Sequence, residues 1–155
     1  MAVAIRAGAY AGAMSRKAEK IAVKMAGAGG GGVDPRYAGY FECFNRGEFY
    51  EAHEVLEQLW LPERGGRNDP FYKGLIQVAG AFVHLQKDRL GPAAALLKLA
   101  RRNLMLYPPE HEHLDMTQVL ALIGRWLAKL EEGGGNPLTA ETRPKMALLK
   151  APDQK

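Results

Sequence analysis

Apolar side chains between residues 34 and 135 recur every three or four positions, which is the spacing of one face of an α-helix. Asp34-Pro35 and Asp69-Pro70 each place a capping carboxylate before a proline, an arrangement that is typical of a helix start. Gly47 and Gly133 follow helical stretches, at the position where glycine often ends a helix. These signals predict five helices, at residues 35–46, 48–61, 69–87, 91–107 and 115–132.

The connections between these helices are short, which makes consecutive helices antiparallel neighbours. We therefore predict an all-α fold, a compact bundle of about five helices built from two antiparallel helical hairpins plus a C-terminal helix. The composition agrees, because Ala and Leu together number 42 whereas Val, Ile and Thr together number 14. His111-Glu112-His113 follows two prolines and is predicted to be a polar loop.

Glycine and charge divide the chain into three parts. Residues 1–33 form a basic Ala/Gly-rich tail and linker, with five basic residues, one acidic residue and a run of four glycines near its end. Residues 34–135 are the predicted helical domain, and residues 136–155 are a C-terminal extension that we expect to dock through Met146, Leu148 and Leu149. Since residues 34–155 hold sixteen basic and sixteen acidic side chains, the net charge of +4 belongs to the tail.

This composition excludes several classes of protein. The single cysteine, Cys43, rules out a disulfide scaffold and a Cys-based zinc site, and no apolar run reaches the roughly 18–20 residues that span a bilayer. A neutral domain beside a basic tail is weak evidence for nucleic-acid binding, so we expect neither a membrane nor a nucleic acid as partner. We expect a cytoplasmic protein. Organellar targeting by residues 1–33 is the alternative, but transit peptides are rich in serine and this segment has one.

The predicted helix at 48–61 carries an unusual polar stripe. His53 and Glu57 lie one turn apart, between Tyr50 and Trp60 on the same stripe and beside the apolar face. We predict that the core contains Phe49, Ala52, Leu56 and Leu59. The opposite side, which should meet solvent, holds Glu51, Glu54 and Gln58.

The predicted helix at 69–87 carries two further polar side chains beside its core face. Its apolar stripe consists of Phe71, Leu75, Val78, Phe82 and Leu85. Gln77 and His84 lie on an adjacent face together with Gly74 and Ala81, whose small size allows another helix to come close.

Histidine and glutamate are common ligands of divalent metals, and a pair at i, i+4 can bind one ion together. A second histidine from a neighbouring helix would complete a set of two histidines and one carboxylate, with open positions for water or substrate. The candidate metal ligands are therefore His53, Glu57 and His84, and the residues expected to line the pocket or orient a substrate are Tyr50, Trp60 and Gln77. Glu57 and His53 are the candidate catalytic residues. The same spacing also suits an ordinary stabilising pair on a helix, and this alternative stays open.

Two blocks of the sequence resemble a known family. The first, Phe44–Trp60, contains the pattern His-x3-Glu-x2-Trp as His53, Glu57 and Trp60, and the second is Lys73–Leu85. With the later Gly91-Pro92-Ala93, they are similar to the domain of unknown function 309 family, over roughly residues 35–107. The resemblance implies a small all-helical protein without an assigned activity. It also implies a functional role, through metal binding, for His53, Glu57, Trp60, Gln77 and His84.

Two functions follow from these observations. The first is metal-assisted hydrolysis at a polar or divalent-metal site built on the motif, with a divalent metal ion as the cofactor. The alternative is a non-enzymatic helical-hairpin interaction module in which the motif is structural and Trp60 is a packing anchor. The sequence leaves the substrate, the metal, the partner and the oligomeric state open, and a homo-oligomer is compatible with it.

Overall fold

The computed structural model describes residues 32–149. Our predictions for residues 1–31 and 150–155, including targeting by the tail, lie outside the described residues. The described part contains five α-helices, one 3-10 turn and two very short strands. In chain order these are α3 (Pro35–Asn45), α4 (Phe49–Trp60), η1 (Leu61–Glu63), α5 (Asp69–Gln86), α6 (Leu90–Leu104), β1 (Glu110–His111), β2 (Leu114–Asp115) and α7 (Met116–Glu132). The all-α prediction is confirmed.

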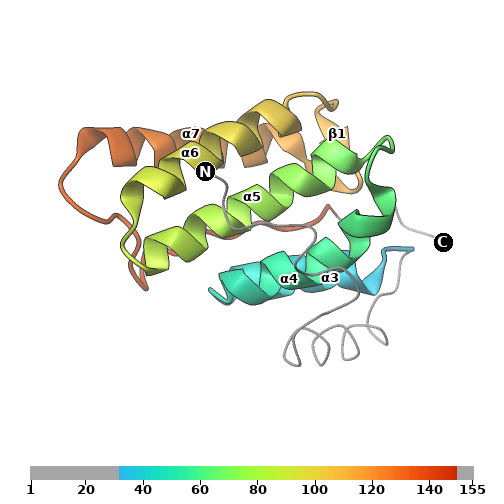
Figure 1. Cartoon of the computed structure of the whole chain (residues 1–155), viewed down its shortest axis with the longest axis horizontal. Helices are drawn as coiled ribbons and strands as arrows, with labels where there is room; N and C mark the ends of the chain where they lie inside the picture. Colours follow the sequence, from blue (N-terminus) through green and yellow to red (C-terminus); the bar gives the residue numbers. More distant parts are fainter. Residues whose placement is uncertain (1–31, 150–155) are drawn as a thin grey trace.

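Helix α5 is the centre of the bundle. It packs against α4 on one side and against α6 on the other, and α3 packs against α4 while α7 packs against α6. Figure 1 shows α5 crossing the middle of the molecule, with α3 and α4 below it and α6 and α7 above it. The two predicted helical hairpins are therefore α3–α4 and α5–α6, and α7 closes the bundle beside the second hairpin. No helix within residues 32–149 combines the length and the apolar character needed to cross a membrane.

One of the two predicted caps is present. The Asp34 carboxylate accepts a hydrogen bond from the Arg36 backbone N–H at 2.8 Å. Asp115, predicted as the first residue of the last helix, instead caps α7 by accepting from the Gln118 backbone N–H. At α5 the prediction is wrong in detail, because Asp69 is the first helical residue and not the cap. Its carboxylate accepts bonds from the Trp60 indole N–H and the Gly65 backbone N–H, both at 2.7 Å. Asp69 therefore joins the end of α4 to the start of α5.

An aromatic cluster forms the middle of the core. The rings of Phe44 and Phe49 lie 5.0 Å apart, and Phe82 stacks on Phe49 and meets Trp126 edge-on at 4.9 Å. These contacts join α3, α4, α5 and α7. The predicted stripe of α5 is completely buried. On α4 the predicted stripe is buried apart from Leu59, which is half-buried.

The helices α5 and α6 approach closely at Gly74, as its small size predicts. A Cβ atom at this position would lie 2.7 Å from Cγ of Leu104, which is a fully buried side chain. Since real Cβ contacts are not that short, only glycine allows the observed separation of the two helices.

The region after α6 differs from the prediction. The helix ends at Leu104, three residues earlier than expected, and the predicted polar loop contains a small antiparallel hairpin. Glu112 and His113 connect the strands with positive φ angles of 48° and 61°. Positive φ at both central residues is the pattern of a type I′ turn, which normally uses Asn or Gly. The sequence Glu-His gives no signal for such a turn.

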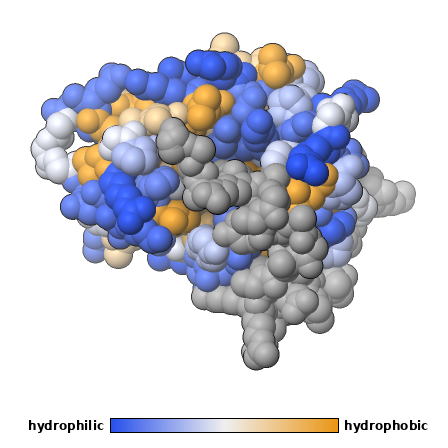
Figure 2. Space-filling view, viewed as in Figure 1, coloured by the Kyte–Doolittle hydropathy of each residue, from blue (hydrophilic) through white to orange (hydrophobic). Residues whose placement is uncertain are grey.

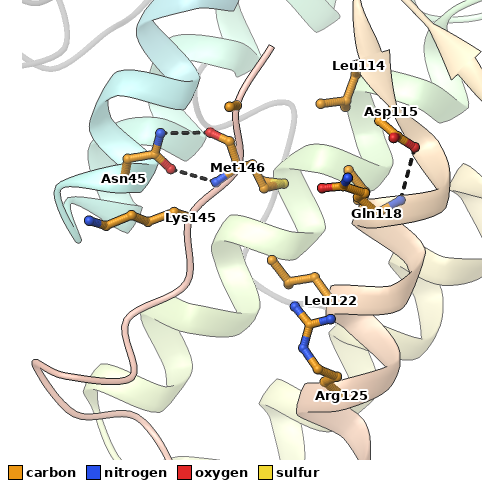
Figure 3. A pocket seen from close by; sticks show the side chains of 10 residues that line it. Asn45, Leu114, Asp115, Gln118, Leu122, Arg125, Lys145 and Met146 are labelled. Atoms are coloured by element: carbon orange, nitrogen blue, oxygen red, sulfur yellow. Dashed lines mark hydrogen bonds between the residues drawn. The ribbon is translucent and has the colours of Figure 1, made fainter. Parts of the chain in front are cut away.

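The chain after α7 runs back across the bundle. The side-chain amide of Asn45 donates to the backbone carbonyl of Met146 at 2.7 Å, and its oxygen accepts from the Met146 N–H at 2.8 Å. Met146 is 6% exposed and points toward α7 (Figure 3), so it docks as expected, whereas Leu149 is 38% exposed. A cavity of about 340 Å³ lies between this segment and α7.

Candidate functional site

Helix α4 places His53 and Glu57 one turn apart inside the protein. His53 is 5% exposed and Glu57 is completely buried. The Nε2 atom of His53 lies 3.7 Å from Oε1 of Glu57. That distance is too long for a hydrogen bond, although the two atoms belong to neighbouring, aligned side chains. The structure therefore brings His53 and Glu57 together as predicted, but their polar atoms are not hydrogen-bonded to each other.

The other ring nitrogen of His53 fixes the tautomer of the imidazole. Nδ1 lies 3.3 Å from the backbone carbonyl oxygen of Tyr50. A carbonyl oxygen only accepts hydrogen bonds, so Nδ1 carries the proton. In the neutral ring, Nε2 then presents its lone pair, and it does so on the side of the Glu57 carboxyl group. The Tyr50 ring packs beside the imidazole, with a centroid distance of 5.4 Å.

Burial shifts the pKa of both members of the pair toward the neutral form. It lowers the pKa of His53 to about 4, against a small opposing effect of the bond to the Tyr50 carbonyl. It raises the pKa of Glu57 to about 7, and the nearby charge of Glu54 raises that pKa further. Near neutral pH the His53 imidazole is therefore uncharged, and the Glu57 carboxyl group is partly protonated and partly ionised.

Glu54 corrects the predicted solvent face of α4. We expected this side chain to meet water, but it is 4% exposed, while Glu51 and Gln58 on the same side are half-buried. Eight of the twelve residues of α4 are buried, so the helix is covered on more than its apolar face. A helical pattern identifies the apolar side of a helix but does not show what covers the polar side.

The buried carboxyl groups of α4 are incompletely hydrogen-bonded. Among residues 32–149, neither oxygen of Glu57 has a hydrogen-bond partner, and neither does Oε1 of Glu54. A buried carboxylate without partners costs free energy of folding, because it loses its water and gains nothing in return. A purely stabilising pair would be expected to have these bonds. Buried polar atoms without partners are found at functional sites more often than in purely structural pairs.

Two other predicted site residues have partners elsewhere. The Trp60 indole N–H donates to Asp69, so its polar atom faces the start of α5. Gln77 is 7% exposed, and its side-chain oxygen accepts a hydrogen bond from the Asn103 amide of α6 at 2.8 Å. Both contacts join helices of the bundle.

His84 lies near the end of α5 and is half-buried. Its buried Nδ1 atom has no hydrogen-bond partner in the part of the chain that the structure describes, and burial lowers the pKa of the imidazole, as do the charges of Arg89 and Lys87. Among residues 32–149, no three His, Cys, Asp or Glu side chains are grouped so that they could hold a metal ion. The structure thus brings His53 and Glu57 together and does not add His84 to them as a third ligand.

Sequence analysis missed Glu54 as part of this site. The spacing could have identified it, because Glu54 and Glu57 are three residues apart and lie on one side of the helix. Neither the cavity beside Met146 nor a second one of similar volume beside Gly47 includes these residues.

Comparison with known proteins agrees with the resemblance seen in the sequence. Residues 37–96 match a family described as a domain of unknown function (DUF309). An uncharacterized protein of Aquifex aeolicus (strain VF5) is 26% identical over 91 residues. The alignment covers 59% of this chain and 27% of that protein, so the chain spans about a quarter of its relative's length. No solved structure matches the chain.

Proposed function

We propose that the His53–Glu57 pair, which lies within the residues that match the DUF309 family, binds a divalent cation. The observation that carries this proposal is the pair of buried, unsatisfied oxygens of Glu57 opposite Nε2 of His53. A lone pair that faces an ionised carboxylate is repulsive unless a positive charge lies between the two groups. Either a proton on Glu57 or a bound cation supplies that charge.

The arrangement suits a cation in two ways. Metal-bound histidines usually donate their second ring N–H to a carbonyl or carboxylate, and His53 makes such a bond to the Tyr50 carbonyl. Bonds of about 2.0–2.2 Å from nitrogen and oxygen to one ion bridge donors up to about 4 Å apart. The 3.7 Å between Nε2 and Oε1 falls within that range.

The remaining coordination positions define the chemistry that such a site would support. The pair supplies two protein ligands, and Glu54 on the same helix is a further buried carboxyl group, whose Oε1 has no hydrogen-bond partner within residues 32–149. The predicted third ligand, His84, would have to move toward the pair. Positions left to water would allow metal-assisted hydrolysis, since a bound divalent ion lowers the pKa of its water.

The interaction-module alternative is favoured by the contacts of Trp60 and Gln77. The Trp60 side chain bonds to Asp69 of α5, and the Gln77 side chain bonds to Asn103 of α6. These bonds join helices of the bundle and do not involve His53 or Glu57. In that alternative the motif maintains the fold, and the polar pair binds no ion.

The two functions are separated by titrating the metal-stripped full chain with Zn²⁺, Mn²⁺ or Mg²⁺ in a calorimeter. We expect one ion per chain to bind, and a thermal unfolding midpoint that rises with ion concentration. At a hundredfold excess over Kd, binding adds about 2.7 kcal/mol to the unfolding free energy. Glu57→Gln and His53→Asn should abolish both effects.

The matched controls are Glu42→Gln and His113→Asn, which remove the same groups elsewhere and should bind like the unchanged chain. Absence of stoichiometric binding, or retention of binding by Glu57→Gln, would eliminate the cation site. Hydrolysis of p-nitrophenyl phosphate and p-nitrophenyl acetate, with and without the ion, tests the reaction separately. Ion binding without turnover would keep the site and exclude hydrolysis of these esters.

A further inference from the structure

The outer side of α6 exposes large apolar side chains. The inner side of this helix is buried and consists of Ala93, Leu96, Leu97, Ala100 and Leu104. On the outer side Leu99 is 39% exposed, and in the turn that follows the helix Met105 and Leu106 are 63% and 68% exposed. Three of the five large hydrophobic side chains that are exposed within residues 32–149 therefore lie on this one element and its turn.

The same surface is strongly basic. The segment from Arg89 to Pro109 contains four basic residues and no acidic one. Lys98, Arg101 and Arg102 are exposed, and none of them takes part in an ion pair with another of the described residues. Along the edge where α6 lies in Figure 1, Figure 2 shows hydrophobic residues next to strongly hydrophilic ones.

This distribution refines the charge analysis of the sequence. Residues 34–155 are neutral in sum, but the charges are not mixed evenly. Lys98, Arg101 and Arg102 lie on α6 beside exposed apolar side chains, and no acidic residue lies between Arg89 and Pro109 to balance them. Amphipathic helices bind partner proteins through their apolar face, and charges of opposite sign beside that face set the orientation.

We propose that this α6 surface, formed by Lys98, Leu99, Arg101, Arg102, Met105 and Leu106, docks an acidic amphipathic helix of a partner protein. Lys98 and Arg102 are one turn apart on α6, Leu99 and Arg102 are three residues apart, and Met105 and Leu106 continue the surface into the turn that follows the helix. Leucine or methionine on the partner would cover Leu99 and Leu106. Glutamates on either side would pair with the cations.

Other occupants fit this surface less well. A second copy bound by two-fold symmetry would place Arg101 and Arg102 against their own equivalents, with like charges together. Nucleic acid would use the cations and leave Met105 and Leu106 in water. Helices that lie on lipid usually carry aromatic side chains at the interface, and the α6 surface has none. The proposal is independent of the cation site on α4, since the two share no residue.

A direct test uses a fluorescently labelled, 18-residue synthetic helix with leucines at i, i+3, i+4 and i+7 and glutamates beside them. Its binding to the full chain is followed by anisotropy at low salt. Arg101→Glu/Arg102→Glu should weaken binding about tenfold or more, and Met105→Ser/Leu106→Ser about fivefold. Arg64→Glu/Arg67→Glu makes the same change of net charge in an exposed loop and should change Kd less than twofold.

All substitutions are at exposed positions, and circular dichroism checks that each variant remains folded. Equal weakening by the two charge reversals would overturn the proposal, because binding would then follow net charge alone. So would tighter binding of the α6 surface to phosphatidylserine vesicles than to the peptide. Concentration-dependent dimerisation that Met105→Ser/Leu106→Ser abolishes would assign the surface to a second copy and would also overturn it.

Discussion

At the scale of single residues, Glu57 is a carboxyl group in surroundings unlike water. It is completely buried on α4, its oxygens have no hydrogen-bond partner among residues 32–149, and Glu54 adds a second negative charge nearby. His53 beside it is shifted in the opposite sense, because burial disfavours its protonated form. The pair therefore responds to pH in two opposing ways.

The sign of each response follows from the pKa shifts. The pKa of Glu57 rises from 4.5 to about 7 on folding, so its ionisation destabilises the fold as pH increases through that interval. The pKa of His53 falls from 6.5 to about 4, so its protonation destabilises the fold as pH decreases through that interval. Between about pH 4.5 and 6.5 the two effects oppose each other.

Glu57→Gln isolates the carboxyl group from this balance. We expect the variant to gain unfolding free energy relative to the unchanged chain as pH rises from about 4.5 to about 7, and to keep that gain above it. One pKa unit corresponds to about 1.4 kcal/mol, so the gain reaches up to about 3 kcal/mol. Urea unfolding in chelator-containing buffers across this pH range measures it.

The control for this prediction is Glu42→Gln. Glu42 forms an exposed ion pair with Arg46, so its replacement should change the unfolding free energy by less than about 1 kcal/mol. A difference between Glu57→Gln and the unchanged chain that does not vary with pH would show that Glu57 titrates normally in the folded protein.

At the scale of secondary-structure elements, two glycines in helices give opposite expectations. Gly74 of α5 faces Leu104 of α6, whereas a Cβ at Gly124 of α7 would meet no atom within 4 Å. The first glycine is required by packing and the second is not. Helix propensity alone favours alanine over glycine by about 1 kcal/mol at either position.

We expect Gly74→Ala to lower the unfolding free energy by about 1–3 kcal/mol, because the added methyl group forces α5 and α6 apart. Gly124→Ala should raise it by up to about 1 kcal/mol. Thermal and urea unfolding of the two variants gives the comparison. Equal effects would mean that propensity, and not the contact with Leu104, controls both sites.

At the scale of the whole molecule, the chain after α7 returns to α3. Asn45 holds Met146 through both polar atoms of its amide, over a sequence separation of 101 residues. Asn136 adds a bond to the carbonyl oxygen of Leu85 at the end of α5. These contacts connect the first and last described parts of the chain, and Figure 3 shows the two bonds between Asn45 and Met146.

Asn45→Ala removes two hydrogen bonds to the Met146 backbone. We expect a loss of about 1–2 kcal/mol of unfolding free energy, since each such bond contributes about 1 kcal/mol. Amide exchange at Met146 should accelerate, whereas exchange in α5 should follow only the global loss. Unchanged exchange at Met146 would show that apolar packing alone holds the segment.

The amino-acid sequence by itself determined the helices and their order. The cap at Asp34, the prolines and the apolar spacing each act within a few residues, so they can be recognised from one segment of the sequence. The close contact at Gly74 was also predictable from one segment, because a glycine inside a helix lowers helix stability and often marks a point where another helix comes close.

Only the tertiary structure decided the environment of the polar residues. Whether Glu54 meets solvent depends on what packs over α4, and the partner of Gln77 is Asn103 on another helix. The hairpin at residues 110–115 forms although Glu112 and His113 have no turn propensity. Burial and hydrogen bonding depend on segments that are far apart in the chain, and helical periodicity describes one segment at a time.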